Sequence, residues 1–163
     1  MAVAMVVTPT AYPVEASPGT IYVPDDYPTI QQAVDNATSG DTIIVRDGNY
    51  TENVVVVTDN LTITSENGTA FTVVEAANPD ADVFNITASY VTLSGFGIEG
   101  ATGDWMAGIY LSGASSGNIS QNIVRYNCIG IYLNQSSNST VAGNIASYNT
   151  RYIPPPPRRW GRQ

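Results

Sequence analysis

The sequence predicts an all-β chain folded as a parallel β-helix, and two observations support this prediction. Short runs of Val, Ile, Thr and Phe alternate with Gly, Asn, Asp and Pro, which are the residues that favour turns. The tetrapeptide GIYL at residues 108–111 also recurs at residues 130–133. A repeat of about 22 residues is too short for a propeller blade and suits one coil of a solenoid.

The same offset relates further residues on both sides of GIYL. It places Asn122 over Asn144, Asn127 over Asn149, and Ile119 over Val141. Leucine-rich and helical repeats are excluded, because the leucine spacing and the helix periodicity that they need are missing. We therefore expect coils of about 22 residues, each adding two or three strands about 4.8 Å above the previous coil. Residues 41–150 are long enough for about five such coils.

The elements can be placed in order along the chain. Residues 21–23 give a short strand signal, and Asp25 and Asp26 then offer a helix N-cap, followed by a proline in the first turn. Apolar residues at positions 30, 33 and 34 predict one amphipathic helix over about residues 28–37, which would cover the N-terminal end of the coils. Strands are then expected at residues 42–45, 54–57, 61–64, 71–74, 83–86 and 91–93.

Repeated residues predict ladders that run through the stack. The apolar ladders expected to point inward are Ile109/Ile131, Leu111/Leu133 and Ile123/Ile145. The ladders expected at turns, with amides that hydrogen-bond up and down the stack, are Asn122/Asn144 and Asn127/Asn149.

Composition excludes several kinds of function. The chain has 163 residues, no His, no Lys and a single cysteine, Cys128. Its own residues therefore cannot form a Ser-His-Asp or Cys-His triad, a His-ligated zinc site, a lysine Schiff base or an internal disulfide. The net charge of −8 argues against nucleic acid as a partner, because phosphate binding needs a basic surface.

The two ends of the chain differ in composition from the repeat region. Residues 1–16 are apolar and end in an A-x-A-like pattern, so we expect the remnant of a secretory signal peptide there and a β-helix domain over residues 17–150. No stretch is long and apolar enough to predict a membrane span. Residues 151–163 contain four consecutive prolines and form a non-repeat tail. Nothing like the N-terminal helix follows the last coil, so self-association through an uncapped C-terminal coil is expected.

Eight Asn-x-Ser/Thr sequons also indicate an extracellular or cell-surface location. Glycan attachment explains them, and so does the Asn-, Ser- and Thr-rich turn chemistry of a repetitive β fold; both explanations can hold. The candidate glycosylation sites are Asn36, Asn49, Asn60, Asn67, Asn85, Asn118, Asn134 and Asn138.

Several segments resemble a known family. The matching segments are TIYVPDDYPTIQQAVDNATSGDTIIVRDGNYTENVVV at 20–56, LTITSENG at 61–68, VTLSGFGIEGATG at 91–103, AGIYL at 107–111 and NISQNIVRYNCIGIYLNQSSNSTVAGNIASYN at 118–149. They resemble the secreted right-handed parallel β-helix proteins of archaeal and bacterial cell surfaces, a pectin-lyase-like superfamily that includes NosD-type and carbohydrate-binding or sugar-hydrolase domains. The resemblance covers about residues 20–150. It implies a right-handed, single-stranded β-helix with a short N-terminal capping helix.

The resemblance does not extend to the catalytic residues of the enzymes in this superfamily. The opening segment is similar to that of pectin methylesterases, but their later motifs with two aspartates, glutamines and an arginine are missing. Polygalacturonases need aspartates in later coils, whereas no acidic residue follows Asp104. For a pectate lyase, only Asp104 and Arg125 offer a carboxylate and a base near one another, and a surface ion pair between adjacent coils explains them better. Glu99 and Asp104 are the remaining carboxylate pair. We assign no catalytic residue.

Exposed tyrosines are the candidate binding site. Because Ile109 and Leu111 are expected to point inward, Tyr110 and Tyr132 must point outward one coil apart, and Tyr126 over Tyr148 would form a second ladder. Trp105 could flank them. Such rings suit sugar faces, although aromatic ladders also stabilise stacked strands.

These observations predict a secreted, non-catalytic scaffold of a cell-surface or envelope protein that contacts polysaccharides or envelope glycans. The alternative is the N-terminal part of a polysaccharide lyase, hydrolase or esterase whose catalytic coils are missing here. No cofactor and no metal site are predicted. Calcium has no support from the residues, and the copper association of the NosD type has no matching ligand spacing among the Met and Cys residues.

Overall fold

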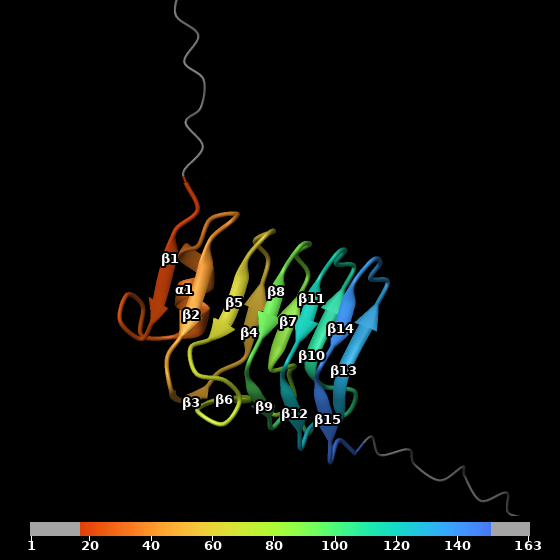
Figure 1. Ribbon diagram of the computed structural model, residues 1–163. Coiled ribbons are helices and arrows are strands. Elements are labelled where there is room, and N and C mark those ends of the chain that lie inside the picture. The colour runs from red at the N-terminus through yellow and green to blue at the C-terminus, as the bar shows by residue number, and fades with distance from the viewer. Residues whose placement is uncertain (1–16, 151–163) are drawn as a thin grey trace, which may run out of the picture.

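The computed structural model describes residues 17–150 and shows a right-handed parallel β-helix built from fifteen short strands and one helix (Figure 1). This confirms the fold class expected from the repeat. The expected signal-peptide remnant at 1–16 and the tail at 151–163 lie outside the described residues.

The strands form three parallel sheets that run along the stack. Sheet A contains β1 (Thr20–Val23), β2 (Thr42–Val45), β5 (Thr62–Ser65), β8 (Thr92–Ser94), β11 (Asn118–Ser120) and β14 (Thr140–Ala142). Sheet B contains β3 (Gly48–Thr51), β6 (Thr72–Glu75), β9 (Gly97–Glu99), β12 (Ile123–Arg125) and β15 (Ile145–Ser147). Sheet C contains β4 (Val54–Val56), β7 (Phe84–Ile86), β10 (Ala107–Ser112) and β13 (Ile129–Asn134). Along the chain, the strands of each full coil follow one another through the sheets in the order A, B, C.

Strand register shows that coil length varies along the chain. The offset of 22 residues holds in the last two coils, where Ile109 pairs with Ile131 and Asn122 contacts Asn144. Earlier partners show other offsets, which range from 20 residues for Thr42 with Thr62 to 30 residues for Thr62 with Thr92 and include 26 residues for Glu99 with Arg125. The additional residues form corner loops, including residues 100–106 between β9 and β10. The strands can therefore stay in register while the loops change length.

The core consists of apolar ladders, as predicted, with one exception. In sheet A, Ile63, Leu93 and Ile119 stack in register and are fully buried. In sheet C, Ile109 and Leu111 point inward.

The prediction that Ile123 and Ile145 also point inward is wrong. They do pair in register, but the buried residue of β12 is Val124, and Ile123 is only partly buried because alternate residues of a strand face opposite sides of the sheet.

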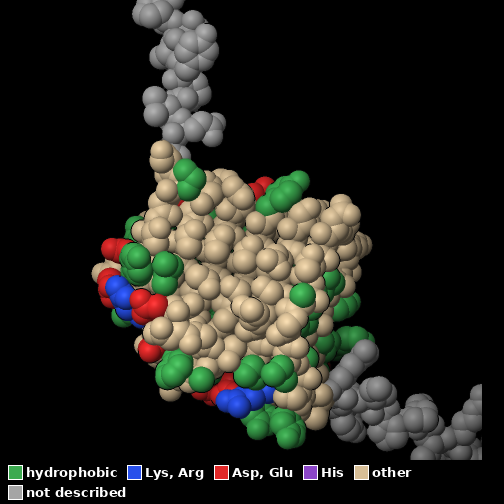
Figure 2. Space-filling model, viewed as in Figure 1, with side chains coloured by type: hydrophobic (Ala, Val, Ile, Leu, Met, Phe, Trp, Pro, Cys, Tyr) green, Lys and Arg blue, Asp and Glu red, His purple; other side chains and the backbone are tan. Residues whose placement is uncertain are grey.

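The outer surface is largely uncharged. On the face shown in Figure 2, charged side chains gather mainly at the end near β1 and along the lower edge. Near β1, Arg46 pairs with Asp25 at 2.6 Å and with Glu66 at 2.7 Å. Arg46 directly follows β2, Asp25 lies just beyond β1, and Glu66 directly follows β5. The two ion pairs therefore connect three successive strands of sheet A.

The helix α1 (Ile30–Asn36) closes the N-terminal end of the stack. Its N-cap is Thr29, whose hydroxyl accepts a hydrogen bond from the Gln32 N–H, and not Asp25 or Asp26 as expected. The N–H groups of Ile30 and Gln31, in the first turn of the helix, donate hydrogen bonds to the carboxylate of Glu52 at 3.0 Å each. An acidic side chain of the first full coil thus completes the cap, which local sequence cannot reveal.

Buried asparagines tie the corners of adjacent coils together, as predicted. Oδ1 of Asn122 accepts a hydrogen bond from the Phe96 N–H, and the N–H of Asn122 donates to Oδ1 of Asn144. Asn127 and Asn149 repeat this pattern at the next corner. Each asparagine therefore supplies hydrogen bonds to backbone groups that a tight corner leaves without strand partners. Within residues 17–150, no helix is long and apolar enough to cross a membrane.

Candidate functional site

Two stacked tyrosine pairs lie on the outer surface of the last two coils. Tyr110 and Tyr132 are neighbours on sheet C, with ring centroids 5.2 Å apart and planes at 16°. They point outward because the residues on either side of Tyr110 in β10 are buried in the core. Tyr132 is 40% exposed, whereas Tyr110 is partly covered. The structure thus brings this predicted pair together as a ladder.

Polar groups surround the first pair. Nδ2 of Asn134 donates a hydrogen bond to the Tyr110 hydroxyl at 3.0 Å. Hydrogen bonds with Ser112 and Asn134 hold the pKa of the Tyr110 hydroxyl below its usual value. Below Tyr110, Asn85 occupies the same ladder in β7, and its Oδ1 is buried with no hydrogen-bond partner among the described residues. The rings therefore adjoin hydrogen-bonding groups of the kind that recognise sugar hydroxyls.

Asp82 adds a carboxylate near this pair. Its Oδ1 accepts a hydrogen bond from the Ala107 N–H at 2.7 Å. Burial raises the pKa of Asp82, although this hydrogen bond partly offsets the effect. Sequence reasoning missed Asp82, because its separation from Ala107 does not match the offset of the GIYL repeat.

The second pair, Tyr126 and Tyr148, lies at the corner between sheets B and C. The ring centroids are 5.6 Å apart with planes at 20°. Both residues have left-handed backbone angles, with φ of 57° and 54°. The side chains are 51% and 73% exposed. Because both coils use the same strained corner, the two rings leave the backbone in the same direction.

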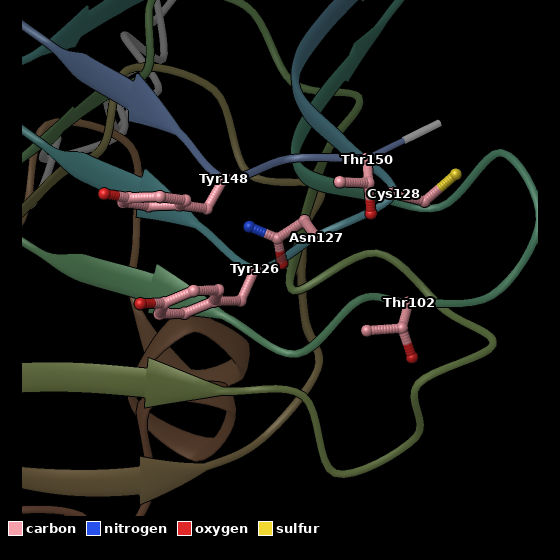
Figure 3. Close-up of a pocket in the computed structure, with 6 residues that line it drawn as sticks. All are labelled: Thr102, Tyr126, Asn127, Cys128, Tyr148 and Thr150. Atoms are coloured by element: carbon pink, nitrogen blue, oxygen red, sulfur yellow. The ribbon is translucent and has the colours of Figure 1, made fainter. Parts of the chain in front are cut away.

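The second pair borders a depression of about 370 Å³ (Figure 3). The residues that line it are Thr102, Tyr126, Asn127, Cys128, Tyr148 and Thr150. Both rings project on one side of Asn127, whereas the Cys128 sulfur points to the other side. The arrangement offers an aromatic face beside a partly polar hollow.

Arg125 connects the second pair to the preceding coil. Its guanidinium carbon lies 5.4 Å from the centroid of the Tyr126 ring, and its Nε donates to Oε2 of Glu99 at 2.9 Å. The expected stacking of Arg125 with Asp104 is therefore wrong, because the register of sheet B matches Arg125 with Glu99 instead. Glu99 and Asp104 are the two carboxylates that the sequence offers for glycoside hydrolysis. Glu99 is paired with Arg125, and Asp104 lies in the loop at residues 100–106.

Trp105 is exposed in that same loop. It is not among the residues that line the depression.

Comparison with known proteins identifies the family. The model of the family described as periplasmic copper-binding protein (NosD) matches residues 34–153, which is more than half of the chain. The chain belongs to the NosD family. A cell surface glycoprotein of Methanothermus fervidus is 36% identical over 98 residues, which cover 59% of this chain and 15% of that protein. These matches confirm the location outside the cytoplasm that the sequence predicts.

Solved structures agree on the fold. A pectin methylesterase in complex with a hexasaccharide superimposes with a TM-score of 0.61 at 13% identity, over 79% of this chain and 50% of that one. The pectin methylesterase PemA of Erwinia chrysanthemi superimposes with a TM-score of 0.59 at 12% identity, over 73% and 46%. The likeness confirms the parallel β-helix fold. The chain spans about half the length of these structures and 15% of the curated relative.

Within residues 17–150, the side chains of this NosD-family chain do not fit a copper site. Copper in proteins is bound by imidazole, thiolate and thioether groups, and this sequence contains no His. Cys128 is buried, and within residues 17–150 no group of three or more His, Cys, Asp or Glu side chains is placed to hold a metal ion.

The eight sequons are spread over all coils and differ in exposure. The exposed asparagines are Asn36, Asn49, Asn60, Asn67, Asn118 and Asn138. Asn85 and Asn134 are partly buried, and both lie beside the Tyr110 and Tyr132 pair. The sequence motif alone does not distinguish the two groups.

Proposed function

We propose that this NosD-family chain is a non-catalytic β-helix scaffold of a cell-surface protein and that its tyrosine pairs bind glycans. The observation that carries the proposal is the presence of two exposed, stacked tyrosine pairs on adjacent coils. A β-helix is a rigid stack, so it holds both pairs at fixed positions along its axis. The relative named as a cell surface glycoprotein supports the scaffold role.

Sugar rings suit these surfaces for a physical reason. An aromatic face stacks on the apolar C–H side of a sugar, and nearby hydroxyl and amide groups bind its polar rim. The Tyr110 and Tyr132 pair has such groups in Asn134 and Ser112, and the Tyr126 and Tyr148 pair has the adjoining hollow. Ring stacking also stabilises the coils, so a test must separate binding from stability.

Replacing Tyr132 or Tyr148 by alanine is expected to weaken glycan binding about tenfold, which corresponds to about 1.4 kcal/mol. Each variant removes the more exposed ring of one pair and so disrupts the binding face. Binding would be measured on an array of neutral and acidic oligosaccharides that includes oligogalacturonates, and thermal unfolding would be followed in parallel.

Tyr90→Ala is the matched control. Tyr90 is exposed at another corner and belongs to neither stacked pair. Loss of thermal stability in Tyr132→Ala and Tyr148→Ala with unchanged glycan binding would show that the rings serve only the stack. Unsaturated products or new reducing ends from polygalacturonate with calcium would contradict the non-catalytic part of the proposal and favour a polysaccharide-active enzyme.

Glycosylation of the chain is the second part of the surface role. We expect glycans on the six exposed sequons and none on Asn85 or Asn134. The Nδ2 that would carry a glycan contacts the Asp82 carboxylate in Asn85 and the Tyr110 hydroxyl in Asn134. Mass spectrometry of glycopeptides from the native protein measures occupancy at each site. Equal occupancy at Asn85 and at exposed Asn60 would contradict this expectation.

A further inference from the structure

A carboxylate lies on the same outer face of sheet C as the rings of Tyr110 and Tyr132. Asn85 points outward from β7, because the residues on either side of it are buried in the core. Its Nδ2 lies 3.5 Å from Oδ2 of Asp82, which places that oxygen on the outer face as well. Since Asn85 pairs with Tyr110 of the next strand, the carboxylate and the first tyrosine ring belong to adjacent rungs of the sheet.

This part of the face lies within the stack and not at its end. The strand β7 is hydrogen-bonded to β4 on one side and to β10 on the other, and β10 is in turn hydrogen-bonded to β13 (Figure 1). Asn85 and Tyr110 therefore have a described strand on both sides. The arrangement of Asp82, Asn85 and Tyr110 is thus set by coils that the structure describes.

The polar groups at this position can both donate and accept hydrogen bonds. The Tyr110 hydroxyl oxygen accepts from Asn134 and Ser112, which leaves its own proton to be donated outward. Oδ1 of Asp82 accepts from the Ala107 N–H at 2.7 Å, whereas Oδ2 has only one long contact, of 3.5 Å, within residues 17–150. A sugar hydroxyl donates one hydrogen bond and accepts others, so it can bind both groups.

Asp82 gives this face a negative charge that no neighbouring cation offsets. The strands of sheet C contain no Arg and no Lys. Within residues 17–150 the cations are Arg46 and Arg125, and both form ion pairs with carboxylates outside sheet C. A uronate ring carries its own carboxylate, for which Arg and Lys are the usual partners. Beside Asp82 that carboxylate would meet a like charge and no partner, which costs affinity.

From these contacts we propose that the Tyr110 and Tyr132 pair binds neutral sugars and rejects uronates, and that Asp82 determines this specificity. The apolar side of the sugar ring stacks on the tyrosines, and its hydroxyl groups bind Oδ2 of Asp82 and the Tyr110 hydroxyl. The inference rests on the glycan binding proposed above and adds the class of sugar.

Matched pairs of oligosaccharides test the proposal. The probes are hexamers of glucose and glucuronate, of galactose and galacturonate, and of mannose and mannuronate, with the same linkage within each pair. Binding is measured by calorimetry on the full chain at neutral pH and low salt, with EDTA present so that calcium cannot bridge two carboxylates. At least one neutral hexamer should bind, and its uronate counterpart should bind at least about tenfold more weakly because of the like charge. Added salt should reduce this difference, because it screens the repulsion.

Asp82→Asn removes the charge and keeps an oxygen for the Ala107 N–H. It should reduce the preference for the neutral hexamer at least about threefold, by strengthening the binding of the uronate. Asp59→Asn is the matched control, because Oδ1 of Asp59 also accepts a backbone N–H of another coil, that of Ser89, at 2.7 Å. Asp59 lies between β4 and β5, outside sheet C, so its loss of charge should leave the preference unchanged.

The outcomes separate this inference from the proposed function. A uronate hexamer that binds as tightly as its neutral counterpart, and loses affinity in Tyr132→Ala, would overturn the specificity and leave glycan binding intact. A preference that Asp82→Asn does not change, or that Asp59→Asn reduces equally, would overturn the role of Asp82. If none of the hexamers bound, glycan binding itself would be contradicted, and this inference with it.

Discussion

Replacing Gly108 by alanine is expected to lower the free energy of unfolding by about 3 kcal/mol, at the upper end of the cost of overpacking a core. An added Cβ would lie 2.5 Å from Cγ1 of Val124 and 2.8 Å from Nδ2 of Asn127. Both neighbours are buried, and Asn127 holds a corner of the stack through several hydrogen bonds. The methyl group can fit only if the corner moves. Urea denaturation followed by far-UV circular dichroism measures the loss.

Gly130→Ala is the matched control for this change. Gly130 holds the same position in the next GIYL repeat, but its added Cβ meets the Asn149 side chain at 2.8 Å and Ala146 Cβ at 3.4 Å. Asn149 lies in the terminal coil, where no described coil restrains it. The expected loss is about 1 kcal/mol. Equal losses in the two variants would mean that the close approach to Val124 does not matter.

The glycine of GIYL shows how far the repeat predicts the structure. Identical residues at a fixed offset predicted the pairing of Ile109 with Ile131 and of Tyr110 with Tyr132, and both pairings are confirmed. Stacking of equal residues satisfies the same packing in each coil, so sequence identity reports register directly. The need for glycine itself was not predicted, because it arises from Val124 and Asn127, which come close to Gly108 only through the turns of the coil.

Prediction was weaker where coil length changes. The strand β9 was missed because it begins with glycine and contains one β-branched residue, Ile98. The loop at 100–106 lengthens one coil, so Arg125 meets Glu99 and not Asp104. The direction of Ile123 was assigned wrongly because β12 has apolar residues on both faces. Three-residue strands give too short an alternation to decide which face is buried.

Only part of the candidate binding site was predicted, because the offset between coils is constant at the tyrosine pairs and differs elsewhere. The two tyrosine pairs follow from the constant offset of the GIYL repeat, which holds in the last two coils. The hollow beside Tyr126 includes Thr102, which lies in a coil with a different offset, and so it could not be derived from the repeat. The buried carbonyl of Asn85 is likewise visible only when β7 and β10 are placed side by side.

Asn127→Ala is expected to have the largest effect on stability, a loss of about 3 to 5 kcal/mol. Asn127 is 1% exposed, its Oδ1 accepts from the Ala101 N–H at 3.0 Å, and its Nδ2 donates to the Ile98 C=O at 3.2 Å. Alanine leaves the Ala101 N–H without its acceptor and removes the hydrogen bond to the Ile98 C=O, and a buried group left without a partner costs about 1 to 3 kcal/mol. Since domains are stable by only about 5 to 15 kcal/mol, the variant should approach the limit of folding.

Two further variants locate the source of this loss. Asn118→Ala, in protein produced without glycans, changes an exposed asparagine of β11 and should cost no more than about 0.5 kcal/mol. Asn149→Ala removes the ladder position next to Asn127, including its hydrogen bond to the Val124 C=O, in the last described coil, where Asn149 is partly exposed. Water can replace part of what it loses, so its cost should fall between the other two. A loss in Asn127→Ala no greater than in Asn118→Ala would mean that water already reaches the corner, and that the asparagine ladder does not hold the coils together.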